Sequence, residues 1–176
     1  AAGVLVAINR ASSAGWEDII TLDVGGTSAD VSLIRQAKPT EVNERNLAGF
    51  PIRIPALDVN VVGAGGGSIA WIDRDGLLKV GPYSAGASPG PACYDRGGED
   101  ATVTDANVLL GRLPGDSLLD GRMPINKSLS QKSVNRLSDR LSLPMDETAL
   151  GIVDVASATM VKAIRSISIE RGHNPA

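Results

Sequence analysis

The sequence has few cysteines and few aromatic residues. Cys93 is its only cysteine, which excludes an internal disulfide framework and a metal site built from cysteines alone. Phe, Trp and Tyr together make up 3% of the 176 residues, so the core must consist mainly of aliphatic side chains. The low cysteine content is typical of a reducing compartment, and we expect a cytoplasmic protein.

An excess of basic residues and a long apolar run are also lacking. Lys and Arg number 17 against 20 Asp and Glu, for a formal net charge of -3. This balance argues against a nucleic-acid partner, because binding to a phosphate backbone needs clustered positive charge. A membrane-spanning helix needs about 20 predominantly apolar residues in a row. We therefore expect no membrane partner either.

Glycine and proline, by contrast, are abundant, with 20 and 10 residues, and they divide the chain into short elements. Apolar residues at helical spacing predict helices over residues 4–11, 105–112, 130–141 and 146–171. Other runs predict strands over residues 19–23, 30–34, 57–62 and 69–72, with further strands around a loop within 40–54. This order predicts an α/β fold in a single domain over residues 1–176, with a mixed sheet flanked by helices.

Local signals set some of the boundaries. Thr104 is the expected N-cap of the second helix. Residues 57–62 are expected to form a buried strand, and the DRDG sequence at 73–76 predicts a turn between two extended segments. Residues 81–98 hold too many Gly and Pro for regular structure, so an ordered loop is expected there. Because the chain starts without Met and stops as the last helix ends, we expect a piece of a longer protein.

The stretch LDVGGTSADVSLI, residues 22–34, places glycines and hydroxyls at the tip of the first predicted hairpin. Gly25 and Gly26 let backbone N–H groups approach an anion, while Thr27 and Ser28 add hydroxyl donors. This pattern is typical of a phosphate-binding turn. The same residue types also make an ordinary turn, and the motif alone leaves both interpretations open.

Two carboxylates flank this tip and are the candidate catalytic residues. Asp23 and Asp30 can hold Mg²⁺ or its waters, and the metal would bridge to the phosphates. Asp30 can instead orient a water for attack on a γ-phosphate. Asp30 is therefore also the candidate metal ligand.

A second glycine-rich run, VGAGGGSIAWID, follows the predicted strand at 57–62. It provides either a second anion or substrate loop or the space for close packing between a sheet and a helix. The residues concerned are Gly63, Gly65, Gly66, Gly67 and Ser68.

Four single residues each have two interpretations. Asp105 is either a charge in the first turn of a helix or a polar group that faces a cleft. Arg96 either reaches a phosphate or carboxylate or ties its loop down through carbonyl groups. Cys93 is better explained as a small buried hydrophobe than as a nucleophile. His173 follows Gly172, where a cation favours the end of a helix.

Four motifs together resemble the hydantoinase A / 5-oxoprolinase family, which also includes subunits of ATP-dependent ketone carboxylases. They are LDVGGTSADVSLI, VGAGGGSIAWID, GPYSAGASPGPACYDRGG and VTDANVLLGRL, in this order, and the terminal AIRSISIERGHNP is similar as well. Two positions depart from the family pattern: Asn60 stands where His is common, and Asp95 stands where Gly is common. The resemblance therefore carries no metal ligand over to position 60.

This resemblance implies a ribonuclease-H-like, actin-like ATPase fold, in which two lobes clamp Mg-ATP between them. The chain would be the C-terminal ATPase lobe, and residues 23–30 would be its phosphate hairpin. The other ATPase lobe of the same protein, with a second phosphate hairpin, would lie upstream of residue 1. A further nucleotide loop would follow residue 176, so the chain alone is expected to be inactive.

The resemblance also implies an activity, namely ATP-dependent hydrolysis of a small cyclic amide by ring opening of hydantoin or 5-oxoproline. ATP and Mg²⁺, or another divalent metal, would be the cofactors, and a second, B-type subunit would be a partner. Two alternatives stay open. The chain would otherwise belong to a subunit of an ATP-dependent ketone carboxylase, or to a non-catalytic actin-like domain for nucleotide binding or interaction.

Overall fold

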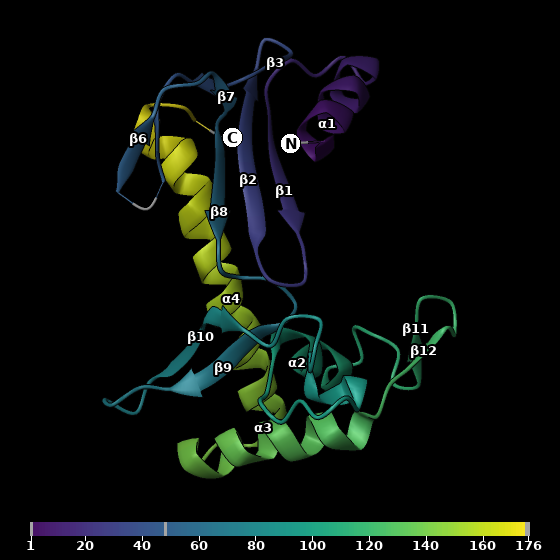
Figure 1. The fold of residues 1–176 in the computed structure, drawn as a ribbon. Helices are drawn as coiled ribbons and strands as arrows, with labels where there is room; N and C mark the ends of the chain where they lie inside the picture. Colours follow the sequence, from purple (N-terminus) through teal and green to yellow (C-terminus); the bar gives the residue numbers. More distant parts are fainter. Residues whose placement is uncertain (1, 48, 175–176) are drawn as a thin grey trace. The chain divides into compact units, whose positions relative to one another are not determined.

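The computed structural model describes residues 2–47 and 49–174 (Figure 1). The chain forms a mixed α/β fold that divides into two compact units. Unit 1 comprises residues 1–23, 30–61 and 161–176, and unit 2 comprises residues 24–29 and 62–160. Each unit is described below by itself.

Unit 1 contains the sheet of the first predicted hairpin. Helix α1 (Ala2–Ser13) precedes β1 (Ile19–Val24), and β2 (Ala29–Arg35) pairs with β1, with β3 (Lys38–Pro39) and with β8 (Val59–Val62). Val31 and Ile34 of β2 are fully buried. The helix predicted over 4–11 and both strands of the hairpin are confirmed. Gly15 ends the helical segment with a positive φ of 78°, a conformation that favours glycine.

Short antiparallel pairs occupy the stretch after β3. Strand β4 (Glu41–Val42) pairs with β7 (Ala56–Leu57), and β5 (Arg45–Leu47) pairs with β6 (Phe50–Ile52). The expected strands around a loop are thereby confirmed. The single buried strand expected over 57–62 is wrong, because Asp58 separates β7 from β8 and Val61 is 58% exposed. Asp58 forms an ion pair with Arg171 instead of continuing an apolar run.

Unit 2 has its own pair of strands, which the predicted turn at 73–76 joins. Strands β9 (Ser68–Ile72) and β10 (Leu78–Ser84) pair antiparallel. Asp73 Oδ1 accepts the N–H groups of Asp75 at 3.0 Å and of Leu77 at 2.9 Å. The hydrogen bond from Leu77 is the main reason that the pKa of Asp73 lies below its ordinary value. The irregular loop expected over 81–98 starts later than predicted, because residues 81–84 belong to β10, and it contains a 3₁₀ turn, Ala92–Tyr94.

Helix α2 (Val103–Leu109) starts two residues before the predicted start, and its N-cap is Thr102, not Thr104. The Thr102 hydroxyl accepts the N–H of Asp105, and the Asp105 carboxylate accepts the N–H of Thr102, which forms a capping box. Thr104 lies inside the helix, where its hydroxyl donates to the carbonyl oxygen of Gly66 at 2.9 Å. The Thr104 hydroxyl is thus engaged with the second glycine run, and the helix is capped by Thr102.

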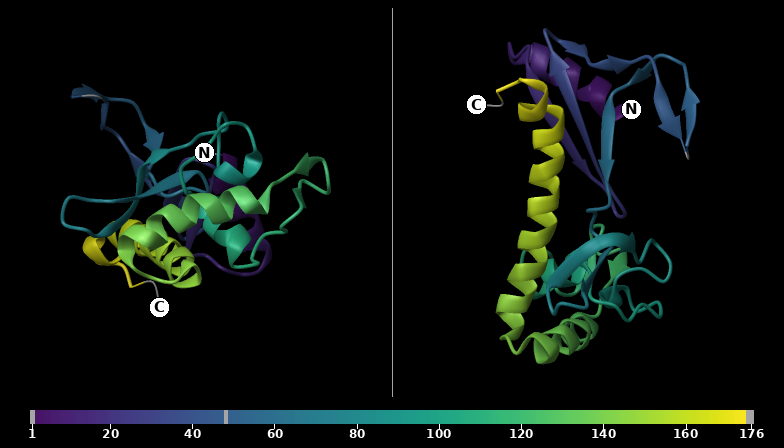
Figure 2. Two further views of the ribbon diagram at one scale, coloured as in Figure 1. Left: turned by 90° about the horizontal axis from the view of Figure 1, so that it is seen from below. Right: turned by 90° about the vertical axis from the view of Figure 1, so that its left-hand side faces the viewer.

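The last third of the chain is helical, as predicted. A short pair, β11 (Ser117–Leu118) and β12 (Met123–Pro124), precedes α3 (Lys127–Leu141) and α4 (Met145–Ile167). Figure 2 shows α4 as one long uninterrupted helix. It ends four residues before the predicted limit, at a 3₁₀ turn, Ile169–Arg171, that Gly172 closes with a φ of 79°.

The core of unit 2 is aliphatic, as the shortage of aromatic residues requires. It joins the β9–β10 pair to helices α2, α3 and α4 through Ala70, Val80, Val103, Ala106, Val134, Leu137, Ala149, Ile152 and Ala156. Among the described residues, no helix is both long and apolar enough to cross a lipid bilayer.

Candidate functional site

The turn of the predicted phosphate hairpin lies in unit 2. The N–H of Gly25 donates to the carbonyl oxygen of Ser28 at 2.8 Å, which closes the turn. Within the described residues, the N–H groups of Gly26, Thr27 and Ser28 donate no hydrogen bond to the protein, and neither do the two hydroxyls. Gly25, Gly26 and Thr27 are exposed, and Ser28 is half-buried. The turn therefore presents a cluster of unused donors, which is what an anion requires.

The carbonyl oxygens of the same turn are occupied. The carbonyl oxygen of Gly25 accepts the N–H of Gly66 at 2.9 Å, and that of Gly26 accepts the N–H of Gly67 at 2.5 Å. Through these two bonds, the second glycine run binds the carbonyl oxygens of Gly25 and Gly26. An approaching phosphate would thus meet donors on the turn, while the carbonyl oxygens of Gly25 and Gly26, which would repel it, are engaged by the second glycine run.

The second glycine run packs closely against this turn. A Cβ on Gly65 would lie 2.7 Å from the carbonyl oxygen of Gly25, and a Cβ on Gly67 would lie 2.9 Å from that of Gly26. A Cβ on Gly66 would lie 2.9 Å from Thr104 Oγ1, on helix α2. These distances are shorter than real Cβ contacts, so a larger residue at Gly65 or Gly67 would force a backbone shift, and one at Gly66 would displace the Thr104 side chain.

The N–H groups of this run are also used inside unit 2. Those of Gly66 and Gly67 bind the turn, and that of Gly65 donates to Ser68 Oγ at 2.9 Å. Ser68 is fully buried, and its hydroxyl donates to the carbonyl oxygen of Gly63 at 3.3 Å. Of the two interpretations of this run, the arrangement is that of close packing, with the partner being the turn as well as a helix.

Asp105 is completely buried, and donors of unit 2 surround its carboxylate. Oδ1 accepts the N–H of Cys93 at 2.8 Å and the hydroxyl of Ser130 at 2.7 Å. Oδ2 accepts the N–H of Ala92 at 3.1 Å and both the N–H and the hydroxyl of Thr102. This carboxylate ties the loop at 92–93 to α2 and α3, which is the structural interpretation of Asp105.

Cys93 and Arg96 differ in burial. Burial, with the nearby charge of Asp105 second, raises the pKa of the Cys93 thiol to about 12, so the thiol stays protonated. Arg96 is exposed.

Between Cys93 and Arg96, Asp95 adopts a left-handed conformation with φ 54°, which explains why glycine suits this position in the resembled family. Asp95 Oδ2 also accepts Asn126 Nδ2 at 3.2 Å.

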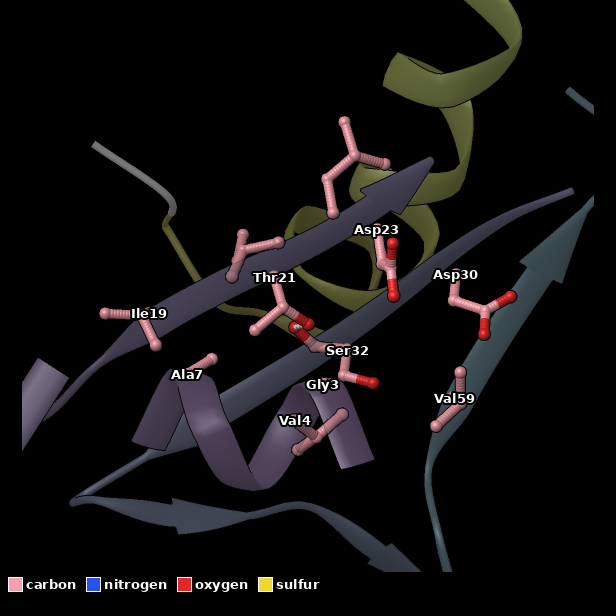
Figure 3. Close-up of a pocket in the computed structure, with 11 residues that line it drawn as sticks. Gly3, Val4, Ala7, Ile19, Thr21, Asp23, Asp30, Ser32 and Val59 are labelled. Atoms are coloured by element: carbon pink, nitrogen blue, oxygen red, sulfur yellow. Dashed lines mark hydrogen bonds between the residues drawn. The ribbon is translucent and has the colours of Figure 1, made fainter. Parts of the chain in front are cut away.

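Asp23 and Asp30 lie in unit 1, on two paired strands. Because side chains alternate along a strand, Thr21 and Asp23 share one face of β1, while Asp30 and Ser32 share one face of β2. All four line one cavity of about 360 Å³, together with residues of α1 (Figure 3). A Cβ on Gly3 of α1 would lie 3.3 Å from Asp23 Oδ2. The structure thus brings together the two predicted carboxylates and two hydroxyl residues, Thr21 and Ser32, that the sequence motifs do not single out.

The carboxylates of this cavity suit magnesium rather than a metal held by protein alone. The described residues hold no group of three or more His, Cys, Asp or Glu that could bind a metal. Mg²⁺ is usually bound through one or two carboxylates, with water and phosphate oxygens as its other ligands. Asp23 and Asp30 are compatible with that kind of binding.

Asn60, where the family pattern has His, is held by α4. Its Nδ2 donates to Ser166 Oγ at 2.9 Å and to the carbonyl oxygen of Ala163 at 3.5 Å. An asparagine amide in this position links β8 to the helix through hydrogen bonds. His173, also in unit 1, follows the end of the 3₁₀ turn, and its N–H donates to the carbonyl oxygen of Ser168 at 2.9 Å.

Comparison with known proteins identifies a family and several relatives of the chain. The family model described as Hydantoinase/oxoprolinase matches residues 1–176. Caprolactamase subunit alpha from Pseudomonas jessenii is 40% identical over 162 residues, which is 92% of this chain and 23% of that protein. The gamma subunit of acetophenone carboxylase from Aromatoleum aromaticum is 37% identical over 177 residues, which is 99% of this chain and 24% of that protein.

Solved structures of two such enzymes share the fold. Nucleotide-free acetone carboxylase, solved for the mechanism of ATP-dependent acetone carboxylation, matches with a TM-score of 0.90 at 30% identity. The match covers 99% of this chain and 25% of that one. The ATP-dependent caprolactamase of Pseudomonas jessenii matches with a TM-score of 0.87 at 38% identity, over 97% of this chain and 25% of that one. The chain therefore spans about a quarter of the length of these relatives.

Proposed function

Because the chain belongs to the hydantoinase/oxoprolinase family, we propose that it supplies a phosphate-binding turn and two catalytic carboxylates to an ATP-dependent enzyme that opens cyclic amides. The observation that carries this proposal is the turn at 25–28. The N–H groups of Gly26, Thr27 and Ser28 are unused, while the carbonyl oxygens of Gly25 and Gly26 are bound to the second glycine run. An ordinary surface turn does not need free N–H groups beside bound carbonyl oxygens, whereas a phosphate-binding turn does.

The roles of individual residues follow from the kind of group that each one presents. Gly25, Gly26, Thr27 and Ser28 form the phosphate-binding turn: Gly25 closes it through its N–H, and the other three N–H groups and the two hydroxyls bind phosphate oxygens. Asp30 binds Mg²⁺ or orients a water, and Asp23 supports it. Magnesium, when bound, neutralises phosphate charge and so lowers the cost of phosphoryl transfer.

The need for ATP follows from the substrate. An amide carbon is a poor electrophile, and transfer of the γ-phosphoryl group to the amide oxygen forms a new P–O bond with ADP as leaving group. Water then adds to the carbon, the C–N bond breaks as nitrogen takes a proton, and a second water hydrolyses the remaining acyl phosphate to the carboxylate and phosphate. Hydantoin and 5-oxoproline are the ring types proposed. The names of the relatives support this class, since one of them is an ATP-dependent caprolactamase.

The wider setting is part of the proposal. The chain is a lobe of a ribonuclease-H-like, actin-like ATPase, and a second lobe of the same protein completes the nucleotide site. A second subunit takes part in the reaction, as the subunit names of two relatives suggest. We place the enzyme in the cytoplasm.

A ketone carboxylase is the second candidate function. The observation that favours it is the TM-score of 0.90 against acetone carboxylase, compared with 0.87 against the caprolactamase. Sequence identity favours the hydrolase, at 38% for the caprolactamase structure against 30% for the carboxylase structure.

Phosphate release from Mg-ATP by the full-length protein, with its second subunit, tests the proposal. Hydantoin, 5-oxoproline, caprolactam, acetone and acetophenone are added separately. Stimulation by one of the three cyclic amides supports the proposal, and stimulation by a ketone alone moves the protein to the carboxylases. No stimulation by any compound, with nucleotide still bound, would favour the non-catalytic alternative.

A further inference from the structure

The cavity of unit 1 has a polar end and an apolar wall. Its polar residues come from β1 and β2, namely Thr21, Asp23, Asp30 and Ser32. Its apolar residues come from α1, β1 and β8, and they include Val4, Ala7, Ile19 and Val59 (Figure 3). A volume of about 360 Å³ falls within the range of small-molecule pockets. The cavity therefore suits a small ligand with a polar and an apolar side.

Ser32 is the feature that points to a ligand. It is 3% exposed, and its Oγ is the one buried side-chain oxygen or nitrogen in the described residues that has no hydrogen-bond partner. Buried hydroxyls in folded proteins are nearly always hydrogen-bonded, so an orphan beside a cavity calls for a partner from outside. Its neighbour Thr21 does not supply one, because the Thr21 hydroxyl donates to the Ser32 carbonyl oxygen at 3.4 Å.

We propose that this cavity binds the ring of the cyclic amide, with the Ser32 hydroxyl donating to the amide oxygen and the Asp23 carboxylate accepting the amide N–H. This inference rests on the proposed function and adds the place where the substrate sits. The amide group of a small lactam is cis, so its C=O and N–H lie on the same side of the ring. Such a ligand needs one donor and one acceptor side by side, with an apolar surface for its methylene groups.

Other small ligands use fewer of these features. A ketone has no N–H for a carboxylate to accept, and a bare metal ion gains nothing from Val4, Ala7 and Ile19. No basic side chain lines the cavity within the described residues, which argues against a carboxylate-bearing ligand unless a cation accompanies it. A neutral lactam ring uses the donor, the acceptor and the wall together.

Ala7 lies on the apolar wall of the cavity, and the size of its side chain limits the space for the ring. Replacing it with Leu adds bulk inside the cavity without lowering helix propensity. A seven-membered ring should lose more binding than a five-membered one. Val6, the next residue on α1, is 62% exposed, so V6L is the matched control on the same helix.

Steady-state kinetics of the full-length protein with its second subunit test the proposal. S32A should raise KM for the stimulating amide about 10-fold, which corresponds to the loss of one hydrogen bond. ATP hydrolysis without amide should not change, because Ser32 has no part in phosphate binding. A7L should raise KM more for caprolactam than for hydantoin, a neutral five-membered ring, and V6L should change neither. Because the Ser32 hydroxyl has no partner, S32A should fold with an unchanged Tm.

Calorimetric binding of caprolactam and hydantoin to the wild-type protein, without ATP, gives a second readout. Weaker binding by S32A and A7L supports the cavity. Unchanged KM and unchanged binding in both variants, while amides still stimulate ATP hydrolysis, would overturn the inference and leave the proposed function standing. Absence of amide stimulation in the wild type would defeat the proposed function, and absence of calorimetric binding as well would defeat the inference.

Discussion

The N–H of Gly66 donates to the carbonyl oxygen of Gly25 at 2.9 Å, across 41 positions of sequence. This bond makes the second glycine run the support of the first turn. The run has no side chains because its backbone lies against the backbone of the turn, where a Cβ on Gly65 would come within 2.7 Å of Gly25, Thr27 and Ser28 atoms. The two glycine motifs therefore act as one structural unit.

Gly65→Ala should destabilise the protein, because the atoms that its Cβ would meet are backbone and cannot rotate away. Overpacking of this kind costs about 1 to 3 kcal/mol. Thermal unfolding of the full-length protein should show a lower Tm. Gly26→Ala is the matched control, since nothing lies within 4 Å of its Cβ position. Equal Tm values for both variants would contradict the packing described.

Asp105→Ala should be far more harmful than replacement of an exposed carboxylate. It leaves the N–H groups of Ala92 and Cys93 and the hydroxyl of Ser130 without their buried acceptor. Each buried donor left without its acceptor costs about 1 to 3 kcal/mol. Denaturant unfolding measures the loss, and Asp100→Ala, at an exposed position, serves as control. A stable Asp105→Ala protein with impaired ATP hydrolysis would instead return Asp105 to the functional residues.

Local sequence patterns were sufficient to predict most helices and strands, but not which segments of the chain contact one another. The strand pattern around residues 22–34 predicts both strands of the hairpin, because alternation and turn residues act within a few positions. The contact of Gly66 with Gly25 depends on chain segments that are far apart, and nothing in the glycines themselves distinguishes packing from anion binding. Thr102 was missed as N-cap because the capping box with Asp105 competes with the cap expected at Thr104.

In the candidate site, too, some residues could be found from the sequence and others only from the folded structure. Asp23 and Asp30 stood out through the motif, since their residue types match phosphate and metal chemistry. Ser32 did not, although its spacing of two from Asp30 places both on one face of β2. Its importance depends on the missing hydrogen-bond partner and on the cavity beside it, and both are features of the folded structure alone.

Cys93 should resist alkylation in the folded protein. Its thiol is buried, and a pKa raised to about 12 leaves almost no thiolate at neutral or mildly alkaline pH. Iodoacetamide at pH 8 should therefore modify Cys93 only after denaturation, as mass spectrometry of the peptide that contains it would show. Rapid modification of the native protein would mean that the loop at 92–94 opens readily.

Asp30→Asn should lower ATP turnover strongly while the protein stays folded. The amide keeps the size of the side chain but loses the negative charge, so it neither binds Mg²⁺ well nor orients a water as a base. We expect a loss of about 100-fold or more in kcat, in line with the contribution of general acid–base groups. Asp139→Asn, at an exposed position of α3, controls for the loss of one charge. Circular dichroism and Tm confirm folding of both variants. Wild-type turnover in Asp30→Asn would remove this carboxylate from the mechanism and leave the turn at 25–28 as the remaining evidence for phosphate binding.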